Sequence, residues 1–89
     1  MITMMVEFDP TAAATYVRLR DEAVVRTVEV LDAYCMVDLD AAGEPVGVEI
    51  LDAPAEVGDA LFEALGRSFP VLDVRALRLA LSGHPVAAA

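Results

Sequence analysis

The first half of the chain consists of short runs in which aliphatic and polar residues alternate. Alternation with a period of two is typical of a β-strand that buries one face. In VVRTVEV (24–30), for example, Val28 and Val30 fall on one side and Thr27 and Glu29 on the other. The pattern predicts five short strands, within residues 4–10, 15–20, 24–30, 34–40 and 46–50.

The links between these runs are short and rich in turn residues: DPTAA, DEA, LDA and AAGEP. A crossover between parallel strands needs roughly a dozen or more residues, so the strands are expected to form an antiparallel β-meander over residues 1–52. The aliphatic positions then share one covered face. This face consists of Val6, Phe8, Val17, Leu19, Val28, Val30, Val37, Leu39, Val48 and Ile50.

The hydrophobic pattern becomes helical after the last strand. Asp52 is a suitable N-cap, and Pro54 is tolerated in a first helical turn. Apolar residues then recur at intervals of three and four, as in an amphipathic helix that ends near Gly66 or Ser68. The stripe is Val57, Ala60, Leu61, Ala64 and Leu65.

A second helix is predicted from Asp73, its N-cap, to Gly83, with Val74, Leu77 and Leu81 facing inward. These elements indicate the α+β class: a sheet followed by two C-terminal helices packed on one of its faces. We expect a single domain over residues 1–89, with a helical part at 53–83 and a frayed tail at 84–89.

The charge balance narrows the range of partners. The chain has 15 acidic residues against six arginines and no lysine, and its formal net charge is −9. Eleven of the acidic residues and three of the arginines lie within residues 1–52. Nucleic acids are bound through Lys and Arg, so this balance argues against a nucleic-acid partner and favours encounter with a basic one.

Several features describe the expected environment of the protein. The single cysteine, Cys35, alternates inward and is expected to be a buried thiol, which suits a reducing cytoplasm. No apolar run approaches the roughly 18–20 residues that cross a bilayer, so no membrane association is expected. Because so short a chain buries a modest core, a partner subunit would help, and we expect a homodimer.

The sequence offers no catalytic, cofactor-binding or metal-binding signature. It contains no phosphate-binding glycine loop, no CxxC and no HExxH pattern. His84 is the only histidine and follows the expected end of the second helix. We therefore identify no catalytic residue and no cofactor, and expect a protein that is not an enzyme.

Three stretches resemble a known family. FDPTAAATYVRL (8–19), VVRTVEV (24–30) and VDLDAAGEPVGVEILDA (37–53) are similar, in order and spacing, to the domain of unknown function family 2283. Phe8 stands where the family usually has Tyr, and Pro45 stands in the hairpin where a basic residue is frequent. The resemblance covers about residues 6–53. It implies a small β-rich domain without an established activity and is compatible with an antitoxin-like, partner-binding role.

The strand pattern leaves one sheet face rich in carboxylates. With aliphatic residues kept on the covered face, Glu7 is expected opposite Arg18, Arg18 opposite Thr27, and Asp38 opposite Glu49. Either Thr27 or Glu29 is expected on the other side of Asp38, and no basic residue is expected near Asp38, Asp40 and Glu49.

Three interpretations of this face remain open: a solvated polar surface, a docking surface for a basic partner or a second subunit, and a divalent-cation site. Aromatic residues and Met are enriched at interfaces, which favours docking. Our leading hypothesis is a protein-interaction module, and the alternative is a small metal-dependent enzyme or cation-binding protein that uses Asp38, Asp40 and Glu49. The candidate partner-binding residues are Tyr16, Arg18, Glu29, Tyr34, Met36, Asp38, Asp40 and Glu49.

Overall fold

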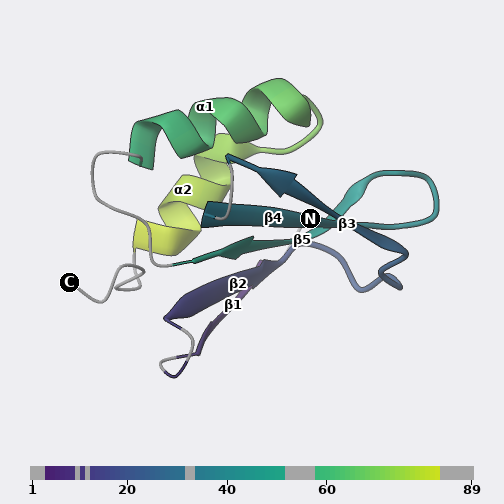
Figure 1. Ribbon diagram of the computed structural model, residues 1–89, viewed down its shortest axis with the longest axis horizontal. Coiled ribbons are helices and arrows are strands. Elements are labelled where there is room, and N and C mark those ends of the chain that lie inside the picture. Colours follow the sequence, from purple (N-terminus) through teal and green to yellow (C-terminus); the bar gives the residue numbers. More distant parts are fainter. Residues whose placement is uncertain (1–3, 10, 12, 32–33, 52–57, 83–89) are drawn as a thin grey trace.

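The structure, a computed structural model, describes residues 4–9, 11, 13–31, 34–51 and 58–82. Its elements follow the predicted sequence of strands and then helices (Figure 1). They are β1 (Met5–Asp9), β2 (Ala14–Arg18), β3 (Arg26–Val30), β4 (Cys35–Leu39), β5 (Pro45–Ile50), α1 (Gly58–Ser68) and α2 (Val74–Ser82).

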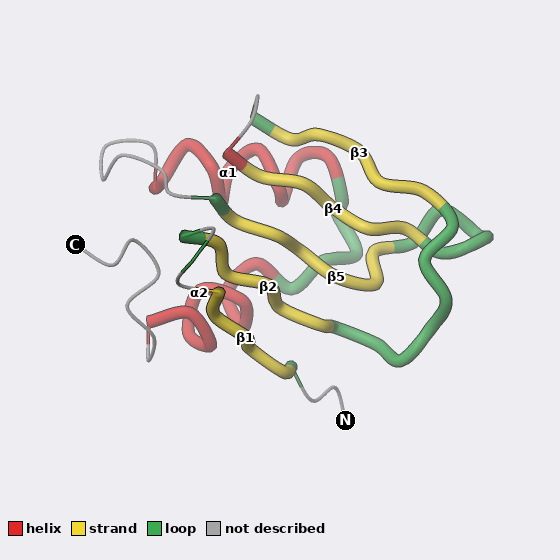
Figure 2. The backbone as a smooth tube through the Cα atoms, turned by 60° about the horizontal axis from the view of Figure 1, so that its bottom comes forward, coloured by secondary structure: helices red, strands yellow, loops and turns green. Residues whose placement is uncertain are grey.

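The predicted α+β class is confirmed: the five strands form one antiparallel sheet, and the two helices follow it in the chain. Figure 2 shows the strands side by side with both helices behind them, so the helices cover one face. None of the helices in the described ranges is long and apolar enough to cross a membrane.

The strand order differs from that of the predicted meander. The order across the sheet is β1-β2-β5-β4-β3, so β5 lies between β2 and β4. Five of the six residues of β5 are buried, and a central position gives such a strand pairing on both edges. The link 19–25 therefore crosses the end of the sheet to the far edge, three strand spacings or about 14 Å away, which seven residues can span.

The position of β5 changes the cross-strand neighbours. Arg18 and Asp38 both lie opposite Gly47, one on each side of it. The predicted pairings of Arg18 with Thr27 and of Asp38 with Glu49 are therefore wrong. Strand β5, the second strand of the β4–β5 hairpin, lies between β2 and β4. Local alternation does not reveal that a later strand is inserted there.

Two further pairings were predicted at the sheet edges. Glu7 lies opposite Tyr16 and not opposite Arg18, a shift of two residues that keeps every side chain on its predicted face. For Asp38, the pairing with Thr27 is the one that forms.

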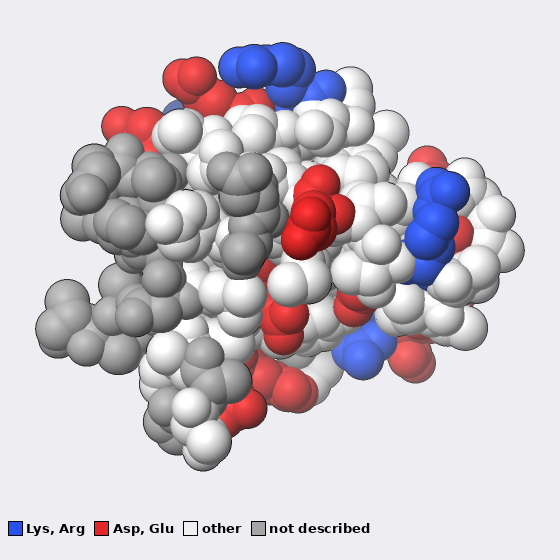
Figure 3. Space-filling view, viewed as in Figure 1, with Lys and Arg blue, Asp and Glu red and all other residues white. Residues whose placement is uncertain are grey.

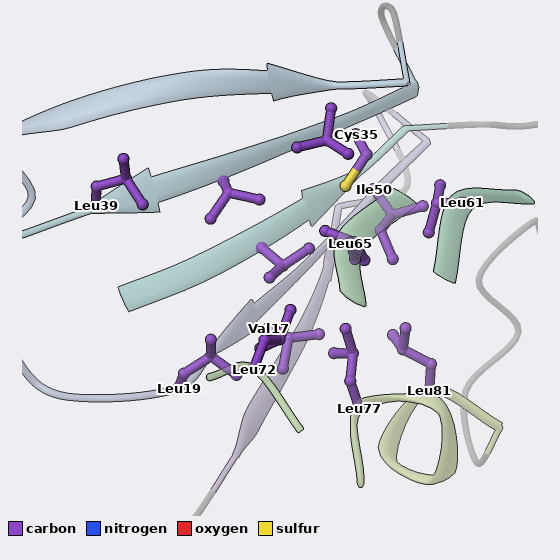
Figure 4. Close-up of a cluster of buried hydrophobic side chains, with 13 residues drawn as sticks. Val17, Leu19, Cys35, Leu39, Ile50, Leu61, Leu65, Leu72, Leu77 and Leu81 are labelled. Carbon is purple, nitrogen blue, oxygen red and sulfur yellow. The ribbon is translucent and has the colours of Figure 1, made fainter. Parts of the chain in front are cut away.

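The core lies between the sheet and the helices (Figure 4). Val17, Val48 and Val37 lie side by side on the three central strands, and each is fully buried. Leu65 of α1 and Leu77 of α2 close this layer from the helix side. Burial of these side chains supplies most of the stabilisation that a domain of this size can obtain.

Other predicted core positions have different outcomes. Cys35 is fully buried within the core cluster, as expected. Val6 and Val28, on the two edge strands, are only partly buried. Phe8 was predicted on the covered face, but its exposed fraction is 37% because β1 is an edge strand.

The second helix begins as predicted. The amide of Ala76 donates to the Asp73 side-chain Oδ1 at 3.0 Å, and the amide of Leu77 donates to the Asp73 carbonyl at 3.0 Å. Asp73 therefore caps α2. The predicted cap at Asp52 with Pro54, and the tail at 84–89, lie outside the described residues.

Two leucines of α2 test the packing of this layer. Leu77 is fully buried, whereas the exposed fraction of Leu79 is 71%. Leu77→Ala should lower the free energy of unfolding by about 2–5 kcal/mol because it removes core contacts and leaves a cavity. Leu79→Ala, on the same helix, should change it by less than about 1 kcal/mol. Urea unfolding of both variants measures the difference, and equal losses would contradict the orientation of α2.

Candidate functional site: the open face of the sheet

The face of the sheet that points away from the helices is called here the open face. The strand register aligns one residue from each strand in a row across this face. We name it the acidic row, and it runs Glu7, Tyr16, Glu49, Met36 and Glu29 from β1 to β3. Every second strand thus contributes a carboxylate to this row, and the strands between them contribute Tyr16 and Met36.

A second row lies beside it, one step along the strands. It runs Met5, Arg18, Gly47, Asp38 and Thr27 from β1 to β3. In contrast to the acidic row, it holds one cation, one carboxylate and a central glycine. The contacts of the open face are made mainly between the two rows.

Tyr16 connects the rows diagonally. Its hydroxyl donates to Asp38 Oδ2 at 2.9 Å, two strands away. The Thr27 hydroxyl donates to Asp38 Oδ1 at 2.6 Å, so both oxygens of this carboxylate are hydrogen-bonded. The Arg18 guanidinium lies 5.9 Å from the centre of the Tyr16 ring, at the outer limit of a cation–π contact. Asp38 therefore has a structural role, holding Tyr16 against the sheet.

Gly47 provides the space for this arrangement. A Cβ added at Gly47 would lie 1.9 Å from the Tyr16 hydroxyl oxygen and 2.3 Å from Cζ of the ring. The Tyr16 ring thus lies directly over the glycine of β5. A glycine inside a strand often marks such a close approach. Gly47 was thus the one signal of this contact in the sequence.

The environment of Tyr16 disfavours its ionised form. Partial burial and the hydrogen bond to Asp38 raise the pKa of Tyr16 from 10.0 to about 12. Loss of the phenolic proton would place a second negative charge beside Asp38 and close to Glu49. Tyr16 is therefore a neutral hydrogen-bond donor at physiological pH.

Asp40 lies at the start of the β4–β5 hairpin loop and not within the rows. Its Oδ1 accepts hydrogen bonds from the amides of Ala42 and Glu44, both at 2.9 Å, and its Oδ2 accepts one from Arg20 at 2.6 Å. The hydrogen bond from Arg20 is the main reason that the pKa of Asp40 is below its usual value. The prediction that no basic residue lies near these acids is thus wrong for Asp40, because the central β5 brings the end of β2 beside the hairpin.

Of the eight candidate residues, six lie in the two rows. Tyr34 does not: it precedes β4, and its partly buried side chain packs against the core cluster. The turn before β4, with Leu31 at a φ of 59°, interrupts the alternation that predicted an open-face position for Tyr34.

The three carboxylates of the acidic row differ from Asp38 and Asp40. Within the described part of the chain, Glu7, Glu29 and Glu49 form no ion pair. In the view of Figure 3, acidic side chains lie across the middle of the surface and also near its edges, and a basic side chain lies beside them below the middle. The acidic row thus holds the carboxylates of the open face without an ion pair, and Arg18 in the second row is a cation without one in the described ranges.

The alternative of a cation site is not supported. In the described ranges, no three His, Cys, Asp or Glu side chains are grouped in a way that could hold a metal ion. Asp38 is bound to two hydroxyls, and Asp40 is bound to Arg20 and two amides. Cys35 is also unsuited to act as a nucleophile or thiolate ligand, because burial raises its pKa to about 12.

The fold and this face define a small α+β domain with an antiparallel sheet that has one helix-covered and one acidic side. The chain belongs to the family described as protein of unknown function (DUF2283), whose model matches residues 5–53. That match spans the sheet and confirms the resemblance seen in the sequence. Comparisons with curated proteins and with solved structures gave no match.

The contact between Tyr16 and Gly47 predicts a coupled effect on stability. Gly47→Ala should destabilise the protein by about 1–3 kcal/mol, because the new methyl group displaces the Tyr16 ring. In a Tyr16→Ala background the same change should be neutral or stabilising by up to about 1 kcal/mol, since alanine is better than glycine in a strand. A double-mutant cycle by urea unfolding measures the coupling. An equal cost in both backgrounds would show that the ring does not cover Gly47.

The raised pKa of Tyr16 predicts a loss of stability at alkaline pH. The unfolded chain releases the phenolic proton near pH 10 and the folded chain near pH 12. This contribution to stability is therefore complete below pH 10 and declines as the pH rises toward 12. Tyr16→Phe should remove that part of the decline, which urea unfolding at several alkaline pH values measures. An unchanged pH profile would show that the fold does not raise the pKa of Tyr16.

Proposed function

We propose that this protein is a protein-interaction module that binds a basic protein partner through the acidic row of the open face. The observation that carries the proposal is the alternation of three carboxylates with Tyr16 and Met36, without a cation paired to Glu7, Glu29 or Glu49 in the described residues. A basic partner would supply the missing counter-charges.

The composition of the row supports binding beyond simple attraction. The net charge of −9 speeds encounter with a cationic partner, but charge alone gives little specificity. Tyr16 and Met36, both partly buried, lie between the carboxylates and offer contact area of the kind found at interface centres. Because Asp38 holds the Tyr16 ring in place, little conformational freedom is lost when a partner packs against it.

The spacing of the carboxylates favours a helical partner. Consecutive acids of the row lie two strands apart, which corresponds to about 9.6 Å. Side chains at i, i+7 and i+14 of an α-helix recur every 10.5 Å or so on one face. Side chains on one face of an extended strand recur every 6.6 Å or so and match less well. A helix laid across the strands would thus present its cations to Glu7, Glu49 and Glu29 in turn.

The family resemblance favours one form of this function. A small, basic, toxin-like protein is a partner of the required chemistry, and masking its basic helix would be an antitoxin-like role. A hollow of about 180 Å³ between the β4–β5 hairpin and the α1–α2 link is smaller than typical ligand sites of roughly 300–1,000 Å³. The open face is therefore the stronger candidate.

Two synthetic helical peptides of identical composition test the proposal. One carries arginines at i, i+7 and i+14, and the other distributes them around the helix at i, i+5 and i+10. The first should bind more tightly, with an affinity that falls as salt is added. Calorimetric titration at two salt concentrations measures both effects.

Substitutions then locate the binding surface. Each of Glu7→Gln, Glu29→Gln and Glu49→Gln should weaken binding of the first peptide by about 2- to 5-fold, as expected for solvent-accessible ion pairs. Glu63→Gln on α1 removes the same charge from the helical layer and should leave binding unchanged. If the triple variant bound the peptide as tightly as the wild type, the acidic row would not be the site.

A further inference from the structure

The two edges of the sheet are formed by β1 and β3. An edge strand leaves a row of backbone amides and carbonyls without partners in the sheet, which is a template for pairing with another chain. Proteins protect such edges with charges or by covering them. The two edges of this sheet carry two charged residues each but differ in how a helix covers them.

The β1 edge exposes large apolar side chains and makes few contacts with the helices. Met5 has an exposed fraction of 57% and Phe8 of 37%, so two of the large exposed hydrophobic residues lie on this one strand. Val6 and the preceding Met4 are partly buried and pack against the core cluster from the side. Two of the five residues of β1, Glu7 and Asp9, are exposed acids.

The β3 edge is protected mainly by a helix. Its five residues include Arg26 and Glu29, both exposed, and its last aliphatic residue, Val30, is buried. Helix α1 packs beside β3, so a chain added to this edge would meet the helix on the covered side. Strand addition is therefore favoured at β1.

We infer that two copies of this protein associate through their β1 strands, antiparallel and centred on Val6, to form one continuous sheet. The occupant of the β1 edge is then a second copy of the chain, because the strand complements itself. The helices of both copies lie on the same side of the joint sheet, and the two partly covered cores meet at the junction. This interface uses the backbone edge of β1 and shares only Glu7 with the acidic row, so it does not depend on the proposed function.

The charge of Glu7 selects the register. Centring the pair on Glu7 would place two carboxylates directly opposite each other, which is unfavourable. Centring it on Val6 places Glu7 opposite Met5 of the second copy, and Met4 opposite Phe8 of the second copy. Every apolar side chain of β1 on the covered side then has an apolar neighbour.

The same register pairs opposite charges on the open face. Arg18 lies beside Met5 in the second row and forms no ion pair in the described ranges. In the dimer, Met5 separates Arg18 from Glu7 of the second copy by two strand spacings, about 9.6 Å between backbones. The long arginine side chain and the glutamate can meet over the methionine, and symmetry repeats the contact.

The interface is small, so the dimer is expected to be reversible. Two five-residue strands bury less surface than a standard interface of about 1,200–2,000 Å². We therefore expect a dissociation constant on the order of micromolar or weaker, as for transient interfaces of small area. The protein should be a dimer when concentrated and a monomer when dilute.

Disulfide trapping tests the interface and its register. In Val6→Cys the two introduced thiols face each other across the dimer axis, within the range that a disulfide bridges. Under mild oxidation this variant should cross-link at least about tenfold faster than Val28→Cys, because pairing raises the local thiol concentration to the millimolar range. Val28 is the matched control, a partly buried valine on the other edge strand. The native Cys35 is buried. The cross-linking rate of the wild-type protein, measured in parallel, gives the background from this thiol.

A second pair of variants uses positions that tolerate substitution. A mixture of Met5→Cys and Glu7→Cys should form the mixed dimer faster than Glu7→Cys alone forms its own dimer. Circular dichroism confirms that each variant is folded. Cross-linking of Val28→Cys as fast as Val6→Cys, faster self-linking of Glu7→Cys, or monomeric β1 variants throughout would each overturn the inference.

Discussion

The structure depends on the insertion of β5 between β2 and β4. Because both edges of β5 are paired, Val48 lies between Val17 and Val37 in the centre of the core. The same insertion places Gly47 between Arg18 and Asp38 on the open face and brings the hairpin loop beside the end of β2. In a sheet whose strands followed the chain order, Gly47 would not lie between β2 and β4, and the hairpin loop would not lie beside the end of β2. The hydrophobic pairing of one strand thus determines the polar arrangement on the opposite side of the sheet.

The open face separates its carboxylates into two kinds. Because Gly47 has no side chain, Tyr16 can lie across β5 and donate to Asp38, whose other oxygen is bound by Thr27. Asp40 is occupied by Arg20 in the same way at the hairpin. These two acids are part of the framework and are unsuited to capturing a cation or a partner. The carboxylates without an ion pair in the described residues belong to the acidic row, which runs across all five strands.

The sequence predicted what depends on local periodicity. Alternation identified the strands and the covered face, and Asp73 was correctly predicted as a helix cap. Strand order is a long-range property, and the same alternation fits several orders equally well. The link at 19–25 was the available signal, since it is longer than a tight hairpin requires. Tyr34 was misplaced because a turn interrupts the period just before β4.

The direction of the acidic row distinguishes the two modes of association that the fold allows. A partner that pairs with an edge runs along the strands and recognises backbone groups, so its side-chain sequence matters little beyond charge and size. A partner that satisfies Glu7, Glu49 and Glu29 must run across the strands, because these residues come from three different strands. One chain segment cannot do both at once. Self-association at β1 therefore uses the backbone edge, whereas recognition at the open face uses side chains, and Glu7 is the residue that the two surfaces share. Pairing two copies would place two acidic rows on one continuous surface.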